Sequence, residues 1–283
     1  MNALPRVSTG IIAAAGSASR MWPASKVFPK ELFPLGRLPA LGYVVWEMVE
    51  AGLEHIVIVV RQGGREPIRA FLDPSVDPPS SVANDDIVKG FTDILRRCRF
   101  TFVEQDGPYG NGTPLLNGSA VAPGETYIFA FADDVVFGEN ASTGLLSTFQ
   151  KCGSPVLCVQ PVAKEDASRF GILEVDARGR IPFVTRFVEK PKPGETSSTL
   201  ASLGRYLVTP AVVDILGTVP LGRGDELWLA DAFINILASG GPIAASELKS
   251  GRWYTVGNPE GFRDAVAASS QLEESGVYSI PRR

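Results

Sequence analysis

Cysteine, histidine and long apolar runs are all scarce in this chain of 283 residues, and each scarcity excludes a class of protein. The three cysteines, Cys98, Cys152 and Cys158, lack C-x-x-C spacing, which argues against a disulfide framework and a cysteine-rich zinc site. Apolar runs such as Ile56 to Val60 are far too short to span a bilayer, and the first residues do not resemble a targeting segment. We therefore expect a cytoplasmic protein without a membrane partner.

Positive charge is also limited, since 27 Lys and Arg face 31 Asp and Glu for a net charge of −4. Without runs of Lys or Arg there is no basic surface to displace counterions from nucleic acid, so nucleic acid is not an expected partner. With 45% hydrophobic and 20% charged residues the chain is predicted to be globular, and it is long enough to bury a full core.

The single histidine, His55, stands at the start of an apolar run and is interpreted as structural. G-x-S-x-G, H-E-x-x-H, the Walker A motif and the G-x-G-x-x-G dinucleotide fingerprint are all missing, which disfavours triad hydrolases, His-ligated metal sites and dinucleotide-dependent oxidoreductases. A reaction that needs no protein base is compatible with this lack. Attack by a sugar phosphate on a nucleoside triphosphate is one, because a phosphomonoester, with a second pKa of about 6, is largely dianionic at pH 7.

What the chain does contain is a series of short apolar runs that alternate with helical patterns. Leu41, Val44, Val45 and Met48 follow helical spacing, and Gly52 comes where such a helix would end. The predicted buried strands are Gly10 to Ala15, His55 to Val60, Phe100 to Val103, Tyr127 to Ala132 and Val156 to Gln160. We predict an α/β fold, Rossmann-like, with a mixed, mostly parallel sheet flanked by helices.

The second half of the chain has a different sequence pattern. Gly171 to Asp176 and Ile181 to Val188 are predicted to form a hairpin, a helix is expected from near Asp225, and a last helix from about Pro259. The hypothesis is one domain over 1–283, with a nucleotide-binding core over about 1–160. A smaller, β-rich substrate-binding part would follow over about 161–260, and a C-terminal helix and tail over about 259–283.

The loop after the first strand is small and flexible at Gly16 and then carries the cations Arg20, Lys26 and Lys30. Small residues let backbone N–H groups approach an anion, and the cations neutralise it, so this loop suits a polyphosphate. An ordinary strand-to-helix connection with solvated cations is about as compatible with the pattern.

Asp133 and Asp134 end the run Tyr127 to Ala132, at the carboxyl edge of a predicted central strand. Mg²⁺ prefers such oxygen ligands, so this pair is the candidate metal site. The alternative is that one aspartate caps the next turn and the other is solvated.

Two further candidates follow strands. Gln105 can read a base edge and Gly110 allows close approach, although a tight turn explains the same residues. Glu189 and Lys190 pair an acceptor for hydroxyls with a cation for phosphate, although a surface ion pair is the simpler interpretation.

Taken in order, these segments resemble the sugar-1-phosphate nucleotidylyltransferases, and among them the bacterial UTP–glucose-1-phosphate uridylyltransferases most. The resemblance covers nearly the whole chain. It rests on Ile11 to Arg20 with Pro23 to Leu35, Gln105 with Gly110, Asp133-Asp134, Phe170-Gly171, Val188 to Pro191, Gly204 to Tyr206, and Gly224 to Asp231.

The resemblance implies an enzyme that joins UTP and α-D-glucose 1-phosphate into UDP-glucose and pyrophosphate, with Mg²⁺ as cofactor and in-line attack on the α-phosphate. It implies these roles: catalytic Arg20, Lys30 and Lys190; nucleotide-binding Ala14, Ala15, Gly16, Ser17, Gln105 and Gly110; sugar-binding Asp134, Gly171, Glu189 and Gly204; and metal-binding Asp133. It also implies a homo-oligomer, a dimer or tetramer.

Two positions depart from the family pattern. Ala18 and Ser19 stand where relatives carry Gly and Thr, which predicts an altered loop geometry because Ala is less free to adopt a positive φ. Thr255 stands where relatives carry a second metal-binding aspartate, so we expect the metal to be held mainly by Asp133 and substrate phosphates.

The sequence leaves alternatives open. Another triphosphate such as dTTP, or another sugar or cyclitol 1-phosphate, would use much of the same framework. A non-catalytic sensor of sugar nucleotides is a further hypothesis, motivated by Thr255 and the changed loop.

Overall fold

The computed structural model describes residues 4–274 and has a mixed α/β fold. The chain forms two compact units. Of the described residues, the N-terminal unit comprises Ser8–Gln105, Ala130–Asn140 and 250–274, and the central unit comprises 4–7, Asp106–Phe129 and Ala141–Lys249.

The N-terminal unit contains three parallel strands, β1 (Thr9–Ala14), β2 (His55–Val60) and β3 (Arg99–Glu104), with β2 in the middle. Thr9 pairs with His55, and His55 pairs with Arg99. Every residue of β2 is buried, as expected for a continuous β-branched run that is covered on both faces. The predicted strands are confirmed, and the ends of all three point to one sheet edge.

Helices supply the cover. Helix α1 (Ala40–Glu50) connects β1 to β2 and buries the predicted stripe of Leu41, Val44, Val45 and Met48. Gly52 turns the chain after α1 with φ 98°, a backbone conformation that a residue with a Cβ adopts less readily. Helices α2 (Arg65–Phe71) and α3 (Asp86–Arg96) precede β3, and the carboxylate of Asp85 caps α3 by accepting from the backbone N–H groups of Ile87 and Val88.

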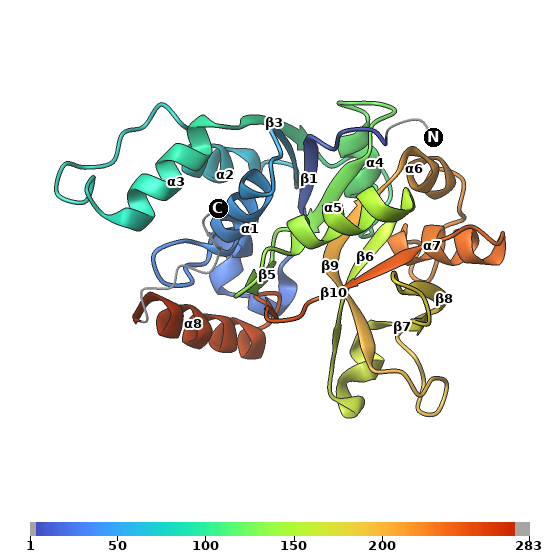
Figure 1. The fold of residues 1–283 in the computed structure, drawn as a ribbon. Coiled ribbons are helices and arrows are strands. Elements are labelled where there is room, and N and C mark those ends of the chain that lie inside the picture. Colours follow the sequence, from blue (N-terminus) through green and yellow to red (C-terminus); the bar gives the residue numbers. More distant parts are fainter. Residues whose placement is uncertain (1–3, 275–283) are drawn as a thin grey trace. The chain divides into compact units, whose positions relative to one another are not determined.

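A second, two-stranded sheet completes this unit. In it, β5 (Asp134–Phe137) pairs antiparallel with β11 (Arg252–Thr255), and Thr255 lies opposite Asp134. Helix α8 (Pro259–Glu274), predicted from the sequence, packs on these strands (Figure 1). The pairing brings a late segment of the chain beside the aspartate pair; residues 275–283 of the expected tail lie outside the described part of the chain.

In the central unit the strand order is β9 (Leu200–Val208), β6 (Val156–Pro161), β10 (Ala244–Glu247), β8 (Phe183–Glu189) and β7 (Gly171–Asp176). Strands β6 and β10 are parallel, whereas the other described pairings of this unit are antiparallel. The predicted hairpin is β7–β8. The helices are α4 (Thr113–Ser119), α5 (Ala141–Cys152), α6 (Pro210–Leu216) and α7 (Leu229–Ala238). Strand β4 (Tyr127–Phe131) runs from this unit into the other.

Helix α7 begins later than predicted. Asp225, the expected start, lies at φ 57° in a turn that is closed by a hydrogen bond from the Gly222 N–H to the Glu226 carbonyl. A left-handed residue cannot continue into a right-handed helix, so the helix starts after this turn, at Leu229.

The scarce residues noted above have structural roles. Cys98, Cys152 and Cys158 are thiols outside any disulfide, and burial raises the pKa of the Cys98 thiol to about 12, which leaves it unreactive. His55 is buried, and its ring nitrogens bond to Thr101 and Arg99 at 2.9 Å each, which confirms a structural histidine. Among residues 4–274, every helix falls short of the length and apolarity that a bilayer crossing requires.

Candidate active site

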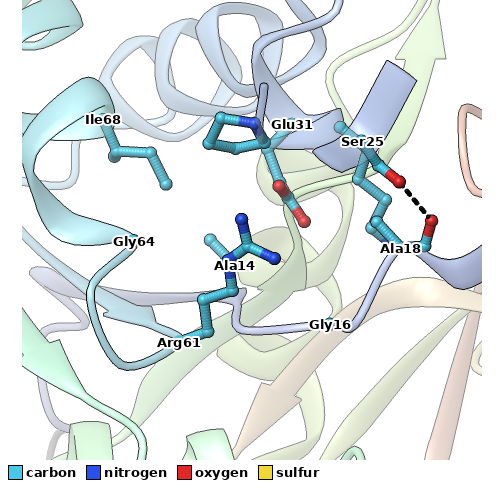
Figure 2. Close-up of a pocket in the computed structure, with 10 residues that line it drawn as sticks. Ala14, Gly16, Ala18, Ser25, Glu31, Arg61, Gly64 and Ile68 are labelled. Atoms are coloured by element: carbon cyan, nitrogen blue, oxygen red, sulfur yellow. Dashed lines mark hydrogen bonds between the residues drawn. The ribbon is translucent and has the colours of Figure 1, made fainter. Parts of the chain in front are cut away.

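The loop that leaves β1 folds into three single-turn 3₁₀ helices, η1 (Ser19–Met21), η2 (Ala24–Lys26) and η3 (Lys30–Leu32). Ala18 precedes η1 with φ 52°. It therefore adopts the left-handed conformation that an alanine was expected to avoid. The Ser25 hydroxyl donates to the Ala18 carbonyl at 2.8 Å and ties the loop to itself (Figure 2). The reasoning that Ala would avoid a positive φ is therefore wrong at this residue, because the fold imposes a conformation that costs Ala about 1–2 kcal/mol, and an altered loop geometry relative to the family stays a prediction.

Lys30 and Asp133 form an ion pair in which the ammonium donates a hydrogen bond to Asp133 Oδ2. Lys30 is only 8% exposed. Asp133 reaches it because the Ala132 N–H bonds to the Ala13 carbonyl at 3.0 Å, which places the end of β4 beside the end of β1. A β-carbon added at Gly16 would lie 3.3 Å from Lys30 Nζ, so the glycine leaves room for the ammonium. Three predicted residues thus meet at one sheet edge.

Neighbouring carboxylates keep the Lys30 ammonium charged. Burial alone would lower the pKa of Lys30, but the nearby carboxylates of Asp133, Glu31 and Asp134 outweigh burial and raise it. Lys30 therefore stays cationic at neutral pH inside a nearly closed site. A buried cation with a carboxylate at hydrogen-bond distance is suited to bind a phosphate group when the anion arrives.

Glu31 was missed at the level of sequence. It is 3% exposed and shares a pocket with Gly16, Lys30, Arg61 and Gly64. In Figure 2 the Arg61 guanidinium, from the end of β2, is turned toward the Glu31 carboxylate. Burial raises the pKa of Glu31 to about 7, although Lys30 lowers it in part. A Glu that follows a Lys in sequence is usually a surface residue, so nothing in the pattern marked its burial.

This raised pKa has a consequence for stability. Because the folded-state pKa of Glu31, about 7, exceeds its ordinary value of 4.5, the protein loses stability as pH rises from about 4.5 through 7. Glu31→Gln removes the ionisation, so we expect the variant to be more stable than the wild type at pH 8 by roughly 3 kcal/mol. The gain should shrink toward zero near pH 4.5. Urea unfolding at pH 5 and pH 8 measures both values.

Glu66→Gln serves as the matched control, since Glu66 is exposed on α2. Its effect on the free energy of unfolding should be within about 0.5 kcal/mol at both pH values. An equal effect of Glu31→Gln at pH 5 and pH 8 would show that the carboxyl does not titrate in this range.

Candidate metal ligands are few. Within residues 4–274 no group of three or more His, Cys, Asp and Glu side chains is placed to hold a metal ion. Asp133 is half-buried, and a β-carbon added at Gly257 would lie 2.9 Å from its Oδ2 and 3.2 Å from Thr255 Oγ1. The Thr255 hydroxyl accepts from the Gly257 N–H at 3.1 Å. One carboxylate and one hydroxyl therefore face the space that glycine leaves open.

The other predicted residues of this unit lie around the same edge. Ala14 and Ala15 are buried at the end of β1, whereas Ser17 and Arg20 are exposed on the loop. Asp134 is buried at the start of β5. Gln105 follows β3, where its N–H bonds to the Val60 carbonyl at 2.8 Å and prolongs the pairing with β2.

Gly110 belongs to the central unit, where its lack of a side chain has a packing reason. It has φ 142°, and an added β-carbon would lie 2.5 Å from the backbone nitrogen of Leu227. The backbones are held together by hydrogen bonds from the Leu227 N–H to the Tyr109 carbonyl and from the Gly112 N–H to the Leu227 carbonyl. A side chain at this position is sterically excluded whether or not a base binds.

In the central unit, Gly171, Glu189 and Lys190 come together at the end of the β7–β8 hairpin. Gly171 pairs with Glu189, and a β-carbon added at Gly171 would lie 2.8 Å from Glu189 Oε2. The Lys190 ammonium lies 3.7 Å from Glu189 Oε1. Burial raises the pKa of Glu189, with Lys190 opposing the rise. Gly204 is buried on β9, which pairs with β7 further along at Ile172.

Known proteins are similar to this chain over nearly its whole length. A model of the nucleotidyl transferase family matches residues 9–271. A UTP–glucose-1-phosphate uridylyltransferase of Pseudomonas aeruginosa is 30% identical over 89% of this chain and 92% of its own. One of Staphylococcus epidermidis is 32% identical over 92% and 91%. A UDP-glucose pyrophosphorylase solved with UDP-glucose superposes with a TM-score of 0.84 at 27% identity, covering 94% of this chain and 99% of that one.

The parallel strands, the cationic loop and the carboxylate at its edge are established by the geometry of this chain, separately from these matches. The chain belongs to the nucleotidyl transferase family.

Proposed function

We propose that this chain is a UTP–glucose-1-phosphate uridylyltransferase, which forms UDP-glucose and pyrophosphate. The observation that carries the proposal is the buried Lys30 ammonium, held between the Gly16 backbone and Asp133 at the carboxyl edge of β1. That arrangement supplies a fixed cation and an oxygen ligand where a triphosphate would meet the loop. The names of the relatives, uridylyltransferase and UDP-glucose pyrophosphorylase, support the choice of substrates.

The proposed reaction needs no proton transfer. A phosphate oxygen of glucose 1-phosphate attacks the α-phosphorus of UTP, the new P–O bond forms, the bond to the bridging α,β oxygen breaks, and pyrophosphate leaves. With the sugar phosphate as a dianion, charge balances without an acid or base. This agrees with a chain whose one histidine, His55, is bonded on both ring nitrogens inside the core. Lys30 and Arg20 would bind the triphosphate, which leaves positioning and charge neutralisation as the chain's contributions.

The donor set fits a divalent cation, and we propose Mg²⁺. Mg²⁺ is commonly held by one or two carboxylates together with substrate phosphates and water, and here Asp133 supplies the carboxylate. Such a cation would supply charge neutralisation for the phosphates when bound. The Thr255 hydroxyl, already bonded to the Gly257 N–H, is a weak additional ligand.

Thr255→Asp tests this assignment. A second carboxylate opposite Asp134 in the β5–β11 pairing should lower the Mg²⁺ concentration that gives half-maximal activity, by about three- to tenfold, because carboxylates hold Mg²⁺ more strongly than hydroxyls. Thr255→Asn introduces a side chain of nearly the same size as Asp but without its charge. It should leave the half-maximal Mg²⁺ concentration at the wild-type value. Coincident Mg²⁺ curves for the Asp and Asn variants would contradict the placement of the metal.

We further propose that the central unit binds the hexose 1-phosphate. Glu189 offers a carboxylate to sugar hydroxyls, Lys190 offers an ammonium to the phosphate, and Gly171 leaves space beside both. Gln105 and Gly110 would bind the base, and Asp134 and Gly204 the sugar. The two compact units do not divide at residue 160, because the N-terminal unit includes β11 and α8 from late in the chain. The assignment of nucleotide and sugar binding to separate parts of the chain stays a prediction.

The proposal is tested by pyrophosphate release from the purified protein with Mg²⁺ and glucose 1-phosphate, run in parallel with UTP, dTTP, CTP, ATP and GTP. We expect UTP to be preferred at least about tenfold in kcat/KM. A preference for dTTP would mean that the nucleotide substrate is dTTP and not UTP. Binding of UTP without pyrophosphate release, with any of several sugar phosphates, would favour the sensor hypothesis. A homo-oligomeric state and a cytoplasmic location stay predictions.

A further inference from the structure

Lys190 is held in an unusual backbone conformation at the end of β8. Its φ of 49° lies in the left-handed region, which is strained for a residue with a side chain. Its N–H bonds to the Phe170 carbonyl at 3.0 Å, so the strained residue is anchored to the neighbouring strand. The surrounding structure thus fixes where this side chain begins, and the direction of the ammonium depends on what it contacts next.

That contact is Trp228. The Lys190 ammonium lies 4.4 Å from the centroid of the Trp228 ring, well within the range of a cation–π interaction. The carboxylate of Glu189, 3.7 Å away, is the second group that it meets. About half of the Lys190 side chain is exposed, at 51%, so solvent and salt weaken both attractions. Together they restrict a side chain that would otherwise sample many rotamers.

The Trp228 ring is itself fixed. Its Nε1–H donates to the Arg223 carbonyl at 3.3 Å, and a β-carbon added at Gly222 would lie 2.9 Å from its Cδ1. Trp228 stands immediately before α7, and α7 packs on β8 through stacked rings of Phe233 and Phe187, 6.4 Å apart. The same packing that joins α7 to β8 therefore brings the ring to the ammonium.

We propose that Trp228 is a positioning residue for the phosphate of the hexose 1-phosphate. The inference rests on the proposed function. The indole ring holds the Lys190 ammonium in the place where it meets the phosphate, so the entropy of ordering a long lysine is lost on folding and not on binding. Trp228 acts through Lys190 and needs no contact with the substrate.

The test is steady-state kinetics on Trp228→Leu and Trp228→Phe. Leu removes the aromatic face, whereas Phe keeps a smaller and weaker one and loses the indole N–H. We expect Trp228→Leu to raise KM for glucose 1-phosphate about tenfold while KM for UTP changes less than twofold, and Trp228→Phe to raise the first value less than threefold. Phe102→Leu is the matched control: it removes another cation–π contact, with Arg65 at 5.8 Å in the N-terminal unit, and should leave both KM values within twofold.

A double-variant cycle separates positioning from general damage. With Lys190→Met already in place, Trp228→Leu should have no further effect on KM for glucose 1-phosphate, because the ring has no ammonium left to hold. An undiminished tenfold effect in the Lys190→Met background would overturn the inference, as would wild-type KM values for Trp228→Leu.

Failure of the proposed function would be visible separately. If the wild type forms no UDP-glucose, the function is wrong, and the inference is decided by calorimetric titration with glucose 1-phosphate. Binding that is about tenfold weaker in Trp228→Leu than in the wild type supports it. Equal binding, or none, overturns it.

Discussion

Lys30→Met is expected to lower kcat/KM for UTP by about 10³-fold. Methionine keeps the length and apolar stem of the lysine but removes the ammonium that lies buried between Gly16 and Asp133. The loss of one fixed donor at a site of developing charge costs about 10²–10³ in rate, and here the lost donor is also a full charge in a site with little solvent. The measurement is initial-rate pyrophosphate release at varied UTP.

Lys89→Met is the control for this variant, because Lys89 is an exposed lysine on α3 with no part in the proposed chemistry. Its kcat/KM should stay within twofold of the wild type. A loss of less than tenfold for Lys30→Met in a folded protein would show that the ammonium does not bind the triphosphate.

Asp133→Asn is expected to reduce both activity and stability. The amide has the shape of the carboxylate without its charge, so metal binding should weaken and kcat fall about 10²–10³-fold at fixed Mg²⁺. Lys30 would keep its burial but lose the carboxylate that raises its pKa most, so that pKa should fall. Breaking this nearly buried pair should cost about 2–3 kcal/mol in the free energy of unfolding, measured with urea.

The double variant Lys30→Met/Asp133→Asn distinguishes the two roles of the pair. Without an orphaned charge, its free energy of unfolding should return to within about 1 kcal/mol of the wild type, while its activity stays as low as that of the worse single variant. Destabilisation that simply adds in the double variant would mean that the two residues do not interact as the structure has them.

The parts of the fold predicted from sequence are those with local signals. The continuous β-branched run of β2 indicates a strand that is covered on both faces, and the apolar stripe of α1 follows the period of a helix that packs on one side; both are present as expected. The edge where Gly16, Lys30 and Asp133 meet follows from the rule that parallel strands present their carboxyl ends together.

The features that could not be predicted depend on the pairing of strands far apart in the sequence, or on the burial of side chains that no sequence pattern marks. Thr255 lies opposite Asp134 because β11 pairs with β5, two segments far apart in the chain with no shared period. The burial of Glu31 depends on tertiary packing around η3, and the contact of Lys190 with Trp228 depends on the packing of α7 on β8. Ala18 shows the converse, since its preference was assessed correctly and the fold overrides it.

The central claim is tested most directly by identifying the product of UTP, glucose 1-phosphate and Mg²⁺ with the purified wild-type protein. ³¹P NMR and mass spectrometry of the reaction should show UDP-glucose and pyrophosphate in equal amounts, and added pyrophosphate should convert UDP-glucose back to UTP. Release of inorganic phosphate in place of pyrophosphate, or no sugar nucleotide while UTP binds, would contradict the account.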